Sequence, residues 1–326
     1  MPHTTAFDPH ALGDLSRLTI AITGANTGIG FEAARLLARG GARILLACRD
    51  EKKGDAARDA IRAETSTARI DVIALDLASL ASVRRAAAEI RERAPALDVL
   101  VNNAGVMALP RRTTADGFEM QIGTNHLGHF ALTGHLLPSL LAAPEARVVT
   151  VSSEMHRRGR MDFDDLQGER RYERWAAYGQ SKLANVLFTY ELERRLRAAG
   201  TSARSLTCHP GYAATDLQRR GPEMEGSTIG RFVMWLGNTL LAQSAEAGAY
   251  PTVYAAVSPD ARGGDYIGPT SFRGMRGAPG HGRSTRSSHD EAAAKRLFEI
   301  SERLTGVRYA ELEPAKAAPV AATRTA

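Results

Sequence analysis

Short apolar runs alternate with longer amphipathic segments along the first two thirds of the chain. Runs such as RILLA and RVVTV are continuously apolar, as in strands that are buried on both faces of a sheet. The runs predict six strands, near Thr19–Thr23, Arg43–Ala47, Asp71–Leu75, Val99–Asn102, Arg147–Ser152 and Ser202–Thr207. The longer segments predict helices near Gly28–Arg39, Glu51–Glu64, Leu80–Arg93, Gly117–Ala142 and Trp175–Ala199. Strand–helix alternation with short links predicts an α/β fold with a doubly wound parallel sheet of the Rossmann type.

The last third of the chain has a different pattern. Residues 154–174 are dense in charge and predict an exposed loop, while a Gly-, Arg-, Pro- and Ser-rich stretch from Arg262 to Ser288 predicts irregular structure. A final helix is expected near Ala292–Thr305. We therefore expect an N-terminal extension (residues 1–16), a single domain (17–312) with a small lid (about 217–243), and a disordered tail (313–326).

Composition narrows the class of protein. The 326 residues are 44% hydrophobic and 24% charged, which suits one large α/β domain. The net charge of +6 is spread over many segments, so no nucleic-acid partner is expected. The two cysteines lie in apolar segments, which indicates a reducing compartment. Since no signal-peptide pattern and no apolar run of membrane-spanning length is present, we expect a cytoplasmic protein without a membrane anchor.

A glycine-rich segment, TGANTGIG, joins the first predicted strand to the first predicted helix. Glycines there allow a tight turn and close approach of the backbone to a pyrophosphate, and the following helix N-terminus favours negative charge. Glycine also serves ordinary turns and caps, but its place between strand and helix indicates a dinucleotide site. The expected cofactor contacts in this segment are Gly24, Asn26, Thr27, Gly28, Ile29 and Gly30.

Residues after the next strands indicate which dinucleotide binds. Arg49 follows the second strand, where a cofactor without a 2′-phosphate usually meets an acid, and its guanidinium suits phosphate. This favours NADP over NAD, although Asp50 beside it either weakens that preference or caps the next helix. Asp76 or the adjacent Leu77 after the third strand could bond the adenine, or Asp76 could be a helix cap in competition with Ser79.

Two further motifs carry chemistry. The fourth strand ends in NNAG, where Asn103, Ala104 and Gly105 would let the backbone lie against the cofactor ribose. Tyr178 and Lys182 lie four residues apart on a predicted helix and so share one face. An ammonium beside a phenol lowers the phenol's pKa and makes a proton donor for neutral pH, although two surface residues could also share a face by chance.

The motifs TGxxxGIG, NNAG and YxxxK, in this order, resemble those of the short-chain dehydrogenase/reductase family, over roughly Leu18 to Ala256. The stretches NNAGVM, TNHLGHF, YGQSKLANVLF and HPG are most similar to its retinol dehydrogenase and protochlorophyllide reductase branch. The resemblance implies hydride transfer between a nicotinamide and a carbonyl carbon, with the cofactor supplying the chemistry and the protein supplying orientation and a proton.

The resemblance also implies four catalytic residues. Tyr178 would be the acid/base, and Lys182 would lower its pKa and bond the nicotinamide ribose. Ser153 would hold the substrate oxygen, with Ser152 as its competitor because side chains alternate along a strand. Asn125 would anchor a water that connects Lys182 to solvent.

The loop after the sixth strand, HPGYAATD, would cover the nicotinamide through Pro210, Gly211 and Thr215. His209 at its start is expected to be structural, as are His126 and His129, which lack partners at metal-ligand spacing. No metal site is therefore expected.

The sequence indicates the class of substrate less clearly than it indicates the cofactor. The apolar lid segment fits a sizeable apolar carbonyl or alcohol, or it is a helix that simply packs on the core or on another subunit. Expected substrate contacts are Ser153, Met155, Tyr212 and Trp235. The alternatives are reduction of an activated C=C bond and a catalytically silent regulator that senses dinucleotides. A homodimer or homotetramer is expected from the resemblance.

Overall fold

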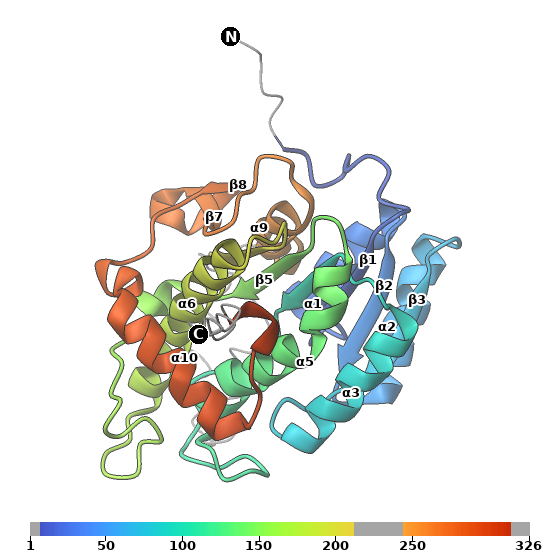
Figure 1. Ribbon diagram of the computed structural model, residues 1–326. Helices are drawn as coiled ribbons and strands as arrows, with labels where there is room; N and C mark the ends of the chain where they lie inside the picture. Colours follow the sequence, from blue (N-terminus) through green and yellow to red (C-terminus); the bar gives the residue numbers. More distant parts are fainter. Residues whose placement is uncertain (1–6, 212–243, 314–326) are drawn as a thin grey trace, which may run out of the picture.

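The structure, a computed structural model, describes residues 7–211 and 244–313. These residues form an eight-stranded sheet in the order β3-β2-β1-β4-β5-β6-β7-β8 (Figure 1). All neighbouring strands are parallel except β7 and β8, which are antiparallel. The strands are β1 Thr19–Thr23, β2 Arg43–Cys48, β3 Ile70–Ala74, β4 Val99–Asn102, β5 Arg147–Val151, β6 Arg204–Cys208, β7 Tyr266–Ser271 and β8 Arg276–His281. The predicted doubly wound fold and its first six strands are confirmed.

Helices cover both faces of the sheet, as alternating side chains along each strand require. In β1, Ile20 and Ile22 pack into the core on one face, and Ala21 packs into the core on the other. The first face carries α1 (Gly28–Arg39), α2 (Glu51–Glu64) and α9 (Ala245–Val257). The second face carries α3 (Leu80–Arg93), α5 (Gly128–Ala142) and α6 (Arg174–Ala198).

The helix expected over Gly117–Ala142 is divided. It begins with a short turn, α4 (Met120–Ile122), continues as a π-helix over Gly123–Leu127 and becomes α5 at Gly128. A β-carbon at Gly128, directly after the π-helix, would lie 2.4 Å from the carbonyl oxygen of Leu77, so glycine allows this close approach. Such π segments often occur at functional sites.

Three elements of the last third were not predicted. The stretch expected to be irregular over Arg262–Ser288 contains β7 and β8, so that expectation was wrong for these residues. The helix α9 has no clear polar face because the sheet, α1 and β8 surround it, and its sequence therefore lacks the amphipathic period. The predicted last helix is present as α10 (Glu291–Thr305).

The C-terminal part covers the outer side of α5 and α6 (Figure 1). Phe298 of α10 and Tyr309 beyond it lie 4.9 Å, ring to ring, from Phe130 of α5. The Tyr309 hydroxyl donates to the Phe130 carbonyl at 2.8 Å. This aromatic cluster joins the C-terminal segment to the core that carries the candidate site.

The expected loop over residues 154–174 is only partly exposed. It begins with a 3-10 turn, Glu154–Arg158, in which His156 is buried. Near its end the hydroxyl of Tyr172 donates to the Leu109 carbonyl at 2.8 Å. The segment therefore packs against the chain that follows β4.

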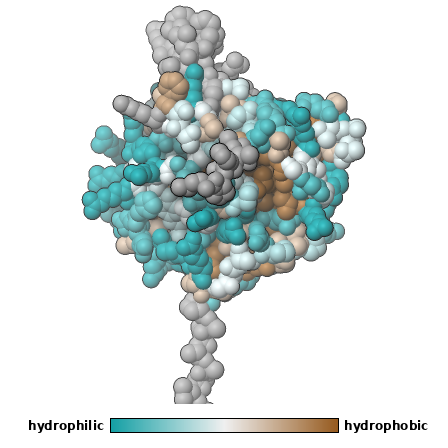
Figure 2. All heavy atoms as spheres, turned by 90° about the horizontal axis from the view of Figure 1, so that it is seen from above, coloured by the Kyte–Doolittle hydropathy of each residue, from teal (hydrophilic) through white to brown (hydrophobic). Residues whose placement is uncertain are grey.

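The described surface is mainly polar. Hydrophilic side chains form most of the face in Figure 2, and apolar ones gather in a patch near its middle. The large apolar side chains exposed among the described residues are Trp175, Phe272 and Met275. Within residues 7–211 and 244–313, no helix has the length and apolar character needed to cross a membrane.

Candidate active site

The glycine loop and the NNAG turn meet where β1 and β4 end side by side. A doubly wound sheet binds its ligand at such a switch point, outside the carboxyl ends of the strands. Gly24 has φ +65°, and a β-carbon there would lie 2.9 Å from that of Ala104. A β-carbon at Gly30 would lie 2.5 Å from the Gly24 carbonyl oxygen. The loop therefore needs glycine at both places to stay close to the NNAG turn.

Side chains lock the two loops together. The amide of Asn103 donates from Nδ2 to the Thr23 carbonyl at 2.7 Å. The Thr23 hydroxyl accepts the backbone N–H groups of Asn103 and Ala104, both at 2.9 Å. The side chain of Asn103, expected at the cofactor, is therefore engaged in joining the loops.

The four residues expected to be catalytic converge beside this turn. Tyr178, with 4% of its surface exposed, is hydrogen-bonded to Ser153. The Lys182 Nζ lies 5.8 Å from the centre of the Tyr178 ring and donates to the Val151 carbonyl at 3.2 Å. A β-carbon at Gly105 would lie 3.1 Å from Asn125 Oδ1 and 3.5 Å from Lys182 Nζ, so glycine keeps this corner open.

The electrostatics differ from the expectation that Lys182 lowers the pKa of Tyr178. Burial raises the pKa of Tyr178 to about 12, against a smaller lowering by the Ser153 hydrogen bond. Burial also lowers the pKa of Lys182 to about 8. The cost of desolvating each charged form is thus larger than the effect of any neighbouring charge. At neutral pH the site holds a neutral phenol and a lysine that is still protonated.

The two serines after β5 have separate roles. The Ser152 hydroxyl donates to the Lys182 carbonyl at 2.8 Å and so fastens β5 to α6. The Ser153 hydroxyl accepts the Met155 N–H at 3.2 Å and bonds Tyr178. The alternation along the strand therefore directs Ser153 to the site.

Asn125 lies in the π-helix and its side chain is fully buried. Its Oδ1 accepts the Val106 N–H at 2.7 Å, and its Nδ2 donates to the Val106 carbonyl and to the Ser181 hydroxyl, each at 2.9 Å. The side chain therefore joins the NNAG turn to α6. Because the polar atoms of this side chain already have partners, the expected relay water would have to bind the backbone of Asn125.

Hydrogen bonds decide two alternatives that the sequence left open, for the acidic residues that follow β2 and β3. Asp50 caps α2 by accepting the Lys53 N–H at 3.2 Å, and Ser79 caps α3 by accepting the Ser82 N–H at 3.3 Å. Asp76 is therefore not a cap of α3, and its carboxylate instead accepts the Ala78 N–H at 3.0 Å. Arg49 directly follows β2 and is exposed.

Comparisons with known proteins agree with this geometry. The family model described as short chain dehydrogenase matches residues 18–226. Human retinol dehydrogenase 13 is 46% identical over 297 residues, covering 89% of this chain and 85% of the relative. Human retinol dehydrogenase 12 is 40% identical over 290 residues, covering 89% and 87%. A crystal structure of an uncharacterised protein from Mycobacterium paratuberculosis matches with a TM-score of 0.77 at 42% identity, covering 94% and 99%.

The chain belongs to the short-chain dehydrogenase family. The resemblance to its retinol dehydrogenase-like branch is confirmed, and the protein is an oxidoreductase that acts on alcohol or carbonyl substrates with a nicotinamide dinucleotide. The glycine cradle and the buried Lys182, which has two further N–H groups to donate, fit that cofactor.

The remaining expected contacts lie around the same crevice or outside the described residues. Gly211 has φ +68°, and its N–H donates to His209 Nδ1 at 3.2 Å. This hydrogen bond stabilises the turn at Pro210 and Gly211. Met155 follows Ser153 in the 3-10 turn and is half-buried. Tyr212, Thr215, Trp235 and the lid over 217–243 lie outside the described residues, as does the tail from residue 314.

The histidines make hydrogen bonds that the sequence pattern did not indicate. His126 Nε2 bonds the Ser301 hydroxyl of α10 at 2.8 Å. His129 Nε2 lies 2.9 Å from the Thr23 hydroxyl, and its spacing of four residues from Asn125 was the available signal. Within the described ranges no cluster of three or more His, Cys, Asp or Glu could hold a metal.

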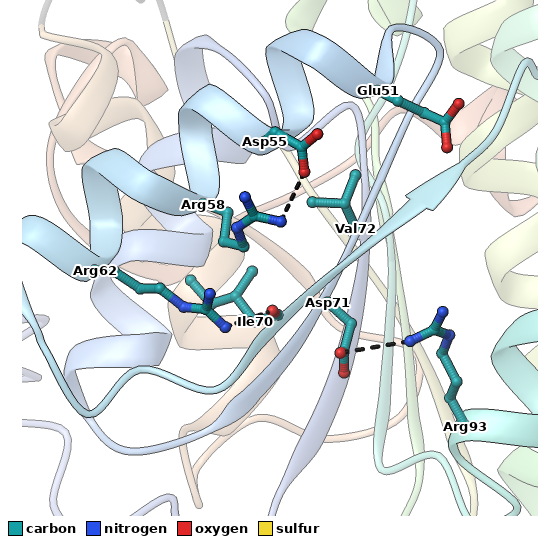
Figure 3. Close-up of a pocket in the computed structure, with 8 residues that line it drawn as sticks. All are labelled: Glu51, Asp55, Arg58, Arg62, Ile70, Asp71, Val72 and Arg93. Carbon is teal, nitrogen blue, oxygen red and sulfur yellow. Dashed lines mark hydrogen bonds and ion pairs between the residues drawn. The ribbon is translucent and has the colours of Figure 1, made fainter.

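A surface groove of about 340 Å³ lies away from this crevice, beside the start of edge strand β3 (Figure 3). Several of the charged side chains that line it have hydrogen-bond or ion-pair partners. Asp71 contacts Arg43 at 2.7 Å and Arg93 at 3.5 Å, and Arg62 donates to the Ile70 carbonyl at 3.1 Å. These arginines protect an exposed strand edge, and nothing in the groove indicates a ligand.

Proposed function

We propose that the protein is an NADP-dependent reductase that converts a sizeable apolar aldehyde or ketone to its alcohol. The observation that carries this proposal is the convergence of buried Tyr178 and Lys182 with Ser153 beside the NNAG turn. A neutral phenol can give a proton to a carbonyl oxygen, and the corresponding phenolate takes that proton back in the reverse reaction. The names of the retinol dehydrogenase relatives support an apolar substrate.

Each residue has a defined part in the proposed reaction. When bound, the nicotinamide supplies the hydride that goes to the carbonyl carbon. Ser153 holds the carbonyl oxygen, and Tyr178 donates the proton as that oxygen becomes negative. Lys182 binds the nicotinamide ribose with the N–H groups that do not reach Val151, and its charge favours the phenolate that remains. The Asn125 backbone anchors the water that returns a proton from solvent.

The test of catalysis compares two tyrosines of α6. Tyr178→Phe should lower turnover by about 10²- to 10⁴-fold while NADPH affinity stays nearly unchanged, because only the proton donor is lost. Tyr190→Phe is the matched control, since its hydroxyl bonds Ser284 at 2.7 Å outside the crevice. Turnover is followed by nicotinamide absorbance with a panel of aldehydes, ketones and enones. Full activity in Tyr178→Phe would remove this residue from its role.

NADP preference rests on Arg49. Arg49→Asp should raise the apparent constant for NADPH much more than that for NADH, because a carboxylate repels the 2′-phosphate. Asp50 is unsuited to compete for a ribose hydroxyl while it caps α2. Equal changes for both nucleotides would refute the phosphate contact.

Two other functions are separable by product analysis and binding. Reduction of an activated C=C bond would use the same Tyr178 and Lys182 and would yield a saturated ketone from an enone. A silent dinucleotide sensor would bind NADPH and turn over no carbonyl compound; the intact set of four catalytic residues argues against it.

Assembly and location stay predictions. A homodimer or homotetramer that paired the outer sides of α5 and α6 would have to displace α10, which covers them. Any such assembly therefore has to use another surface, and light scattering at several concentrations would test it. The cytoplasmic location is supported by two buried free thiols, which suit a reducing compartment.

A further inference from the structure

His129 touches three segments of the candidate site. It lies at the second position of α5 and has 1% of its surface exposed. Its Nε2 is 2.9 Å from the Thr23 hydroxyl at the end of β1, and its Nδ1 is 3.0 Å from the Asn125 carbonyl in the π-helix. The Thr23 hydroxyl in turn accepts two N–H groups of the NNAG turn.

Hydrogen-bond partners assign the imidazole protons. A carbonyl only accepts, so Nδ1 must carry the proton that bonds Asn125. Burial lowers the pKa of His129 to about 4, so the ring is neutral and Nε2 is an acceptor. The Thr23 hydroxyl therefore donates its proton to Nε2, which is closer than the Val101 carbonyl at 3.4 Å.

This direction matters for the NNAG turn. A hydroxyl that donates toward His129 presents its lone pairs toward Asn103 and Ala104, whose N–H groups it accepts. Without His129, the Val101 carbonyl at 3.4 Å is left as an acceptor for this proton, and the hydroxyl would rotate toward it. The same ring also fixes the carbonyl of Asn125, whose side chain holds Val106 and lies beside Lys182 across Gly105.

We propose that His129 is a positioning residue for the reaction, which aligns the NNAG turn through Thr23 and the proton-relay backbone through Asn125. This inference rests on the proposed function, because it assumes that a dinucleotide lies against the NNAG turn. His129 itself is buried behind both loops and does not touch the reacting atoms.

Two amide substitutions separate the two halves of this role. In His129→Asn the amide reaches the position of Nδ1 and keeps the bond to Asn125, but the acceptor for Thr23 is lost. In His129→Gln the amide oxygen reaches the position of Nε2 and keeps the acceptor for Thr23, but the donor to Asn125 is lost. His126→Asn and His126→Gln are the matched controls, since His126 is equally buried and bonds Ser301 of α10 instead.

Calorimetric titration of NADPH into each purified variant is the main measurement. His129→Asn should weaken NADPH binding about 3- to 10-fold, which corresponds to one neutral hydrogen bond, while His129→Gln stays within about twofold of wild type. His129→Gln should instead lower turnover about 3- to 10-fold and alter its pH profile, because the relay backbone is released. The His126 variants should lower only the thermal stability.

A double variant of Thr23 and His129 provides a second test of the proposal in case one substitution disturbs folding. Thr23→Val should weaken NADPH binding, and adding His129→Asn should weaken it little further, because both remove the same interaction. Additive losses, equal affinities in the two His129 variants, or changes matching those of the His126 variants would overturn the role of His129. If wild type binds neither NADPH nor NADH, the proposed function itself fails, and the role of His129 fails with it.

Discussion

Replacement of Lys182 by methionine should stabilise the protein while it abolishes turnover. Lys182 is 3% exposed, has no acidic partner among the described residues, and donates only to the Val151 carbonyl. Burial lowers its pKa from 10.5 to about 8. The folded protein therefore holds a poorly solvated charge, which costs stability.

The size of the gain follows from that pKa. Because the pKa falls from 10.5 to about 8 on folding, the protonated Lys182 destabilises the folded protein by roughly 3 kcal/mol below pH 8. Methionine loses the hydrogen bond to Val151, worth about 1 kcal/mol, but Asn185 still donates to that carbonyl at 3.2 Å. The net gain at pH 7 is about 2 kcal/mol, or roughly 3 °C in melting temperature for a chain of this size.

The pH dependence has a definite sign. Between about pH 8 and 10.5 the unfolded chain holds a proton that the folded wild type has lost, so wild-type stability rises with pH in this window. Methionine does not titrate, so its advantage should be constant below pH 8 and should shrink as the pH rises toward 10.5.

Thermal unfolding of the nucleotide-free protein at several pH values is the assay. Lys295→Met on the exposed side of α10 is the control, and it should leave the melting temperature unchanged. A Lys182→Met variant that melts no higher than wild type at pH 7, or whose gain does not depend on pH, would refute the reasoning.

Two further substitutions test packing, one at the amino end of β5 and one at the glycine loop. Arg147→Met should lower the free energy of unfolding by about 1–3 kcal/mol, since the buried guanidinium donates to the carbonyls of Ala255 and Ser258 at the end of α9; unchanged denaturant unfolding would contradict this. Gly30→Ala should weaken NADPH binding more than about tenfold, because the new methyl group overlaps the Gly24 carbonyl and pushes α1 from the NNAG turn. Wild-type affinity in a titration would show that the loop adapts.

Much of the site could be predicted because its signals are local. The glycines of the first loop, the NNAG turn and the Tyr178–Lys182 spacing are short-range patterns, and the family membership they indicated is confirmed. Ser153 was chosen over Ser152 from the resemblance, Asp76 against Ser79 stayed open, and in both pairs the alternatives differ only in where a side chain points. Their resolution needed the contacts with Lys182, Tyr178 and Ser82.

By itself the sequence determined the order of strands and helices through β6, because buried strands and amphipathic helices have periods that a few neighbouring residues display. Only the tertiary structure decided the placement of β7, β8 and α9. β7 pairs with β6, β8 pairs with β7, and α9 packs on α1. The tertiary structure also decided the raised pKa of Tyr178 and the contacts of His129. Burial and hydrogen-bond direction depend on residues far apart in the chain, and no local pattern contains them.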